Sequence, residues 1–196
     1  QIAFEVLDKL TPPFFIVPGN RDSRSTMRRV FQKLPFVSHT SDDSFIYPVD
    51  NFTIRLIGLD SLCDDDGRGC FCSKRMKKLD NLLMQEPLKP TVLFMHHPPF
   101  IIETATTAYL EFQSKKMSDQ FLSLITRHKQ VFRVFCGHSH QSYTKKIGTI
   151  LFSTIPSVAT DLRRGSYPPN IAEKPIYQIH RHIPLLNFFS ETRIAN

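Results

Sequence analysis

The sequence lacks a long hydrophobic run, which excludes a helix that spans a membrane. None of its apolar stretches approaches the ~18 residues that such a span requires. The N-terminus also lacks the charged and then apolar segments of a secretory signal peptide. Internal repeats and low-complexity segments are absent too, and 196 residues, 41% of them hydrophobic, can bury one sizeable core. We therefore expect a single cytoplasmic domain over residues 1–196, with no membrane partner.

Cysteine is scarce, and its spacing does not match a zinc site. Three of the four cysteines, Cys63, Cys70 and Cys72, flank an acidic loop that contains glycine. The Cys-x-Cys pair lacks the two intervening residues that zinc-binding pairs commonly have, and no fourth ligand lies nearby in the sequence. We expect reduced thiols, with a structural zinc site or a disulfide as the alternatives.

The basic residues are not interleaved with aromatic residues, although the formal net charge is +7. Two runs of them, within 24–29 and 74–78, each fall in an expected helix. Proteins that bind single-stranded nucleic acid combine basic side chains with aromatic ones on which the bases stack. We interpret both runs as solvated helix faces and expect no nucleic-acid partner, whereas a small phosphorylated molecule is compatible with the positive charge.

Apolar runs alternate with segments of helical spacing, which predicts an α/β fold. Short apolar runs, partly β-branched, indicate buried strands at 14–17, 92–95 and 131–136. A hairpin of 45–49 and 52–59 and strands at 143–147, 150–153 and 176–182 are also expected. Helices are expected at 2–10, at 73–85 with Ser73 as cap, at 118–128, and from a cap at Asp22, Ser23 or Ser25 to about Lys33.

Polar residues follow three of the expected strands at the point where each strand ends. These strings are Gly19–Asp22, His96–Pro99 and Gly137–His140. Ligands of open α/β sheets bind beyond the carboxyl ends of the strands, so we expect the three strings to meet there. Imidazole nitrogens and amide oxygens suit divalent transition metals. The sequence therefore predicts a metal site that cleaves phosphoesters.

Four strings, in their order and spacing, resemble those of the calcineurin-like metallophosphoesterases, and above all the bacterial 3',5'-cyclic-AMP phosphodiesterases. They are Val17–Asn20, Leu59–Ser61, Phe94–Phe100 and Cys136–His140. The similarity spans roughly Thr11 to His182. It implies an α/β fold built as a four-layer α/β/β/α sandwich, with the metal site at the rim between two sheets.

The resemblance also implies an activity and roles for six residues. The reaction would be hydrolysis of phosphodiesters, with cyclic nucleotides such as 3',5'-cyclic AMP as substrates, by a hydroxide that bridges two divalent ions of manganese, iron or zinc. Asn20, His96 and His138 would bind one ion and His140 the other. His97 would support the ligands or the substrate. Arg21 stands where many members have histidine, and it can supply charge and hydrogen bonds but no proton.

Two family strings, Asp-x-His and Gly-Asp, do not occur in this chain, although the family has them N-terminal to its Gly-Asn string. The remaining residues give three ligands to one ion and one to the other, so we expect one bound ion or none. We therefore expect an N-terminally truncated domain that lacks its first strand and has weak or no activity alone. The alternatives are a broader phosphodiesterase or phosphomonoesterase of this fold, or a non-catalytic remnant that acts as a binding module. The oligomeric state stays open, a dimer included.

Overall fold

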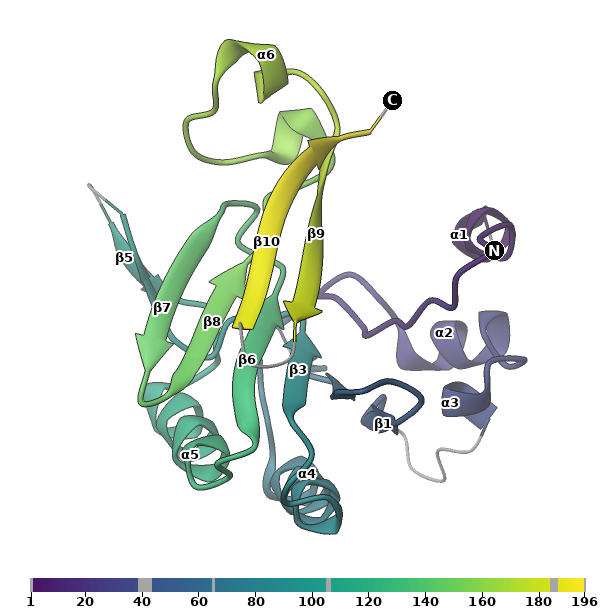
Figure 1. The fold of residues 1–196 in the computed structure, drawn as a ribbon, viewed down its shortest axis with the longest axis vertical. Coiled ribbons are helices and arrows are strands. Elements are labelled where there is room, and N and C mark those ends of the chain that lie inside the picture. The colour runs from purple at the N-terminus through teal and green to yellow at the C-terminus, as the bar shows by residue number, and fades with distance from the viewer. Residues whose placement is uncertain (1, 39–43, 65, 105–106, 184–186, 196) are drawn as a thin grey trace.

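A mixed six-stranded sheet forms the centre of the molecule in the computed structural model (Figure 1). The structure describes residues 2–38, 44–64, 66–104, 107–183 and 187–195. Four neighbouring strands are parallel to one another, and the two edge strands are antiparallel to their neighbours. In spatial order the strands are β1 (Tyr47–Val49), β2 (Arg55–Leu59), β3 (Thr91–Met95), β6 (Val131–Cys136), β8 (Ile150–Thr154) and β7 (Tyr143–Ile147).

Two helices cover one face of this sheet, namely α4 (Ser73–Gln85) and α5 (Lys115–Thr126) (Figure 1). Their apolar residues recur at helical spacing, so a single stripe of each helix enters the core. Leu79, Leu83, Phe121 and Ile125 are fully buried there. Ser114 caps α5 by accepting a hydrogen bond from the Met117 N–H at 3.2 Å. The expected cap at Ser73 is wrong: that residue is the first of the helix, and Cys72 precedes it without a capping bond.

A second, two-stranded sheet packs against the opposite face of the large one. It consists of β9 (Ile176–Ile183) and β10 (Asn187–Ile194). Aromatic rings fill the contact: the Phe135 ring on β6 lies 4.0 Å from the His180 ring, and the Phe132 and Phe188 rings are 5.5 Å apart. A smaller hairpin, β4 (Ile101–Glu103) and β5 (Ala108–Leu110), follows β3, and short helices at Thr160–Leu162 (η1) and Pro169–Ala172 (α6) precede β9.

Three N-terminal helices pack beside the β1 edge of the large sheet: α1 (Ile2–Leu7), α2 (Arg24–Val30) and α3 (Pro35–Ser38) (Figure 1). The Phe36 ring stacks on the Tyr47 ring at 4.3 Å, which joins α3 to β1. Of the three expected caps of α2, Ser23 is the one used, and its Oγ accepts a hydrogen bond from the Thr26 N–H. A mixed α/β fold is thus confirmed, although these helices lie at the sheet edge and not over β9 and β10.

The predicted strand at 14–17 is wrong. The segment joins no sheet among the described residues, and the nearby edge strand β1 is three residues long and pairs with β2. Side chains hold the segment in its place. The Tyr47 hydroxyl donates to the Ile16 carbonyl oxygen at 2.7 Å, and the Phe15 ring packs 5.7 Å from the Phe36 ring. No helix in the described part of the chain has the length and apolar character to cross a membrane.

Candidate metal centre

Two parallel strands and one loop bring the three polar strings to one edge of the sheet. His96 is the first residue after β3, and His138 follows β6 by two residues. These strands are neighbours, and the Gly137 N–H donates to the His96 carbonyl oxygen at 2.9 Å. Asn20 arrives in the loop that leads into α2. The predicted meeting of these strings beyond the strand ends is what the structure shows.

Three side-chain donors converge at this edge. His96 Nε2 lies 3.1 Å from Asn20 Oδ1 and 3.0 Å from His138 Nδ1. Ligand atoms of His96, His97 and His138 all lie within 4.8 Å of one another. Two imidazole nitrogens and an amide oxygen aimed at a common point form a donor set of the kind that manganese, iron and zinc accept. The residues present therefore fit a divalent transition metal.

The backbone at two of the candidate ligands adopts an uncommon conformation. His138 and His140 have φ angles of 62° and 59°, in the left-handed region that few residues other than glycine adopt. Strain of this kind is concentrated at functional sites. A side chain at Gly19 would place its Cβ 3.1 Å from the His96 ring, so glycine lets the Asn20 loop approach that ring.

Burial keeps two of the histidines neutral. The pKa of His96 is lowered to about 4, first by burial and then by the neighbouring His138 and His140. Burial, followed by the charges of His96 and His138, lowers the pKa of His97 to about 3. Neutral imidazole is the form that binds metals, because protonation removes the ring lone pair. His96 is thus in the form that can bind a cation at neutral pH.

Both ring nitrogens of His97 already have protein partners. Its Nε2–H donates to the Gly67 carbonyl oxygen at 3.0 Å, so Nδ1 is unprotonated and accepts from the Ser61 hydroxyl at 2.9 Å. The His97 ring lies 4.6 Å from the His138 ring and is fully buried. His97 therefore packs against the cluster. This arrangement favours a supporting role for His97 over a role as a metal ligand.

Two other predicted site residues lie outside the cluster. His140 Nδ1–H donates to the Leu162 carbonyl oxygen at 3.1 Å, and its binding of a different ion stays a prediction. Arg21 is exposed beside Asn20. Its neighbour Asp22, which was one of the expected helix caps, instead accepts a hydrogen bond from the Gly19 N–H at 2.8 Å. That bond closes the loop that carries Asn20.

Sequence reasoning missed Glu111. Its Oε2 accepts a hydrogen bond from His138 Nε2–H at 3.0 Å, and this bond, together with the charges of His138 and Arg164, holds the pKa of the carboxyl below its usual range. The residue directly follows the short strand β5, which the sequence did not indicate either. No motif surrounds it, so the contact is visible only in three dimensions.

A buried ion pair fixes the Asn20 loop and α2 to the large sheet. Arg24, the first residue of α2, donates from Nε to Asp60 Oδ2 at 2.6 Å and from Nη2 to Oδ1 at 2.9 Å. Asp60 directly follows β2 and is fully buried. Its oxygens also accept the backbone N–H groups of Phe45 and Leu62, each at 3.1 Å. Arg75 Nη1 lies 4.0 Å from Asp60 Oδ1 as a second positive charge. These contacts hold the carboxylate in one position.

The cysteines are separate from this centre. Cys63, Cys70 and Cys72 all carry free thiols. None belongs to a group of three or more metal-ligating side chains within the described residues. Burial raises the pKa of the Cys70 thiol to about 12, so it is not a thiolate at neutral pH.

Comparison with known proteins agrees with the geometry. The family model described as calcineurin-like phosphoesterase matches residues 1–142. The chain is 30% identical over 182 residues to a probable glycerophosphodiester phosphodiesterase, GpdQ, of Arcobacter nitrofigilis, covering 90% of this chain and 64% of that protein. It is 26% identical over 152 residues to the 3',5'-cyclic adenosine monophosphate phosphodiesterase CpdA of Vibrio vulnificus, covering 78% of this chain and 52% of that protein.

The chain thus spans less than two thirds of the length of both relatives. Among solved structures, a dimetal phosphatase from Danio rerio matches with a TM-score of 0.56 at 14% identity, covering 70% of this chain and 59% of that one. At this level of identity the match shows a shared fold.

Proposed function

Because this chain belongs to the calcineurin-like phosphoesterase family, we propose that it is a metal-dependent phosphodiesterase domain whose substrates are small phosphodiesters. The observation that carries the proposal is the convergence of Asn20 Oδ1, His96 Nε2 and His138 Nδ1. These residues are far apart in the sequence, and no core packing requires three polar groups at that point. A ligand site accounts for their meeting.

Some of these side chains would bind the metal ion or the phosphate, and one would support the metal ligands. Asn20, His96 and His138 would hold one divalent ion, which supplies a Lewis acid for phosphate. Arg21, exposed beside Asn20, would bind the charge of the phosphate, and it keeps its own charge at every relevant pH. His97 would keep the two ligand rings in place through its bonds to Ser61 and Gly67.

Cyclic nucleotides, with 3',5'-cyclic AMP as the leading candidate, are the proposed substrate class. The name of the Vibrio vulnificus relative supports this choice. A second candidate is a glycerophosphodiester, because the relative from Arcobacter nitrofigilis bears that name and is similar over 90% of this chain. Both are diesters of phosphate, so the same residues would act on either one.

Metal binding and hydrolysis should be measured together. We expect the chain to bind one Mn²⁺, measured by elemental analysis after dialysis, and His96→Ala to bind none. The matched control is His128→Ala, because His128 pairs with Asp80 at 2.7 Å, away from the cluster. The rates of hydrolysis of 3',5'-cyclic AMP, glycerophosphocholine and a nitrophenyl phosphomonoester are then compared to rank the substrate classes.

Each result has a definite meaning. Diester hydrolysis that requires Mn²⁺ and His96 supports the proposal. Preference for the monoester would contradict the diester assignment. Mn²⁺ binding without turnover of any substrate would favour a binding module, and equal binding by wild type and His96→Ala would refute the site.

A further inference from the structure

Glu111 contacts His138 at the ring nitrogen that does not face His96. Its Oε2 lies 3.0 Å from His138 Nε2, whereas His138 Nδ1 lies 3.0 Å from His96 Nε2. The His138 ring is therefore held between a carboxylate on one side and the candidate metal position on the other.

We propose that Glu111 is a positioning residue that sets the ring orientation and the tautomer in which His138 binds metal, an inference that rests on the proposed function. An ionised carboxylate can only accept a hydrogen bond, so the ring proton must be on His138 Nε2. A neutral imidazole carries one ring proton, so Nδ1 keeps its lone pair, which accepts a hydrogen bond from His96 Nε2–H at 3.0 Å in this structure. That lone pair points to the position that His96 and Asn20 also face.

Glu111 is itself held by the chain around it. The Gly69 N–H donates to the Glu111 carbonyl oxygen at 2.8 Å, and the Gln113 N–H donates to the Gly69 carbonyl oxygen at 2.8 Å. Phe112, between the two residues, is buried. A Cβ on Gly69 would lie 2.6 Å from the His97 Cβ and 2.7 Å from the Phe112 ring, so only glycine fits there.

The contact between Glu111 and His138 differs from an ordinary surface pair. The two side chains are 19% and 16% exposed, so solvent and salt screen the interaction less than on an open surface. Where a metal-binding histidine has such a partner, loss of the partner typically weakens metal affinity by about 10–100-fold. We expect the same range here for Glu111→Ala, and a smaller loss for Glu111→Gln, whose amide oxygen can still accept the bond.

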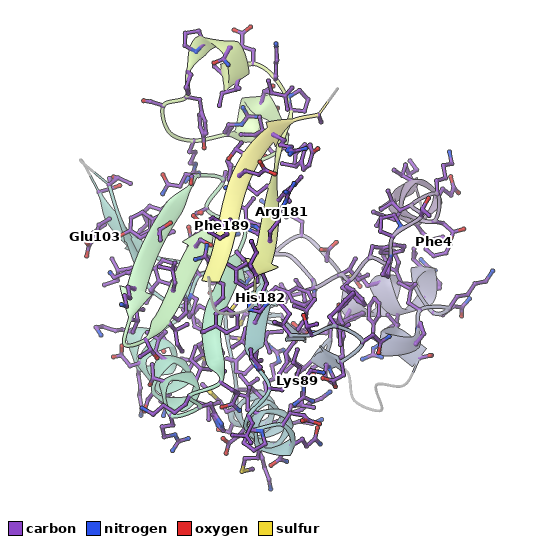
Figure 2. The ribbon with its side chains drawn as sticks, in the orientation of Figure 1. Phe4, Lys89, Glu103, Arg181, His182 and Phe189 are labelled. Carbon is purple, nitrogen blue, oxygen red and sulfur yellow. The ribbon has the colours of Figure 1, made fainter. Side chains whose placement is uncertain are left out.

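Two measurements test the role of Glu111, and one of them does not depend on metal. Nitrogen-15 NMR of histidine-labelled, metal-free protein at neutral pH reports which His138 nitrogen carries the proton. Calorimetric titration with Mn²⁺ then gives the affinity. The matched control is Glu103→Gln, since Glu103 lies on the outer side of the same hairpin, is 62% exposed and pairs only loosely with Lys145 (Figure 2).

In the wild type and in Glu103→Gln, we expect the Nε2–H tautomer of His138 and equal Mn²⁺ affinity. In Glu111→Ala, the Nδ1–H tautomer should gain population and the affinity should fall. An unchanged tautomer, or unchanged affinity in a wild type that binds Mn²⁺, would overturn the role of Glu111. Absence of Mn²⁺ binding by the wild type would instead refute the proposed function, and the tautomer would still decide whether Glu111 sets the ring.

Discussion

Removal of Arg24 should destabilise the whole chain, because it leaves the Asp60 carboxylate buried without its main counter-charge. Asp60 is fully buried and Arg24 is 12% exposed, and two hydrogen bonds of 2.6 and 2.9 Å join them. Breaking a buried pair by removing one partner costs about 3–5 kcal/mol. After the change, the N–H groups of Phe45 and Leu62 still bond to Asp60. Arg75 Nη1 also stays 4.0 Å from Asp60 Oδ1. For Arg24→Ala we therefore expect the free energy of unfolding to fall by an amount near the lower end, about 3 kcal/mol.

A graded series of variants checks this reasoning. Arg24→Lys keeps the charge but not the bidentate geometry, and we expect its free energy of unfolding to be lower by about 1–2 kcal/mol. The control is Lys115→Ala, which removes an ion pair with Asp119 whose side chains are 70% and 57% exposed. The free energy of unfolding of that control should be lower by about 0.5 kcal/mol or less.

Urea unfolding followed by far-ultraviolet circular dichroism gives the free energy of unfolding for each variant. The Asn20 loop leads into the helix that Arg24 begins, so Arg24→Ala should also weaken Mn²⁺ binding. A stability of Arg24→Ala within about 1 kcal/mol of the wild type would refute the argument, because it would mean that Asp60 does not need the two hydrogen bonds and the charge of Arg24.

The remaining predictions concern acid, metal and the core. Burial and the nearby Arg133 lower the pKa of His180 from 6.5 to about 4, so its contribution to stability is complete above pH 6.5 and is lost as the pH falls toward 4. After allowance for solvent screening, this lowers the free energy of unfolding by about 1–2 kcal/mol. Urea unfolding at a series of pH values should not show this contribution in His180→Phe. An identical dependence on pH in both proteins would contradict the assignment. Mn²⁺ at one hundred times its Kd should raise the free energy of unfolding by about 2.7 kcal/mol, seen as a higher Tm in thermal scans, and the gain should vanish in His96→Ala. Leu79→Ala should cost about 2–5 kcal/mol in urea unfolding because that side chain is fully buried, whereas Met84→Ala, at a site 57% exposed on the same helix, should cost about 0.5 kcal/mol or less.

Elements with a strong local signal were predictable. The predicted bounds 73–85, 131–136 and 143–147 are those of α4, β6 and β7. Helical spacing and short apolar runs are properties of neighbouring residues, so a sequence displays them directly. The meeting of His96 and His138 followed from one further rule, that parallel strands end at the same edge of a sheet. Asn20 was expected there for the wrong reason, because the segment before it is not a strand.

Features that depend on distant partners were not predictable. The run at 14–17 is as apolar as a buried strand, but a strand also needs neighbouring backbone with which to pair, and among the described residues this run has none. Glu111 was missed because its partner His138 is 27 residues away, and because the β4–β5 hairpin is too short to show alternation. Strand β10 has two adjacent phenylalanines and then mostly polar and charged residues, which gave no clear period.

The left-handed backbone at His138 and His140 restricts how this edge of the sheet can change by mutation. Asparagine and aspartate tolerate that conformation, as histidine does, whereas valine, isoleucine and threonine are strongly disfavoured because of their branched side chains. Asparagine or aspartate would exchange the imidazole for an amide or a carboxylate oxygen, whereas glycine, which fits this backbone best, would remove the side chain. In the proposed metal site, asparagine or aspartate in place of His138 would therefore shift the preference among cations, whereas glycine would remove a ligand.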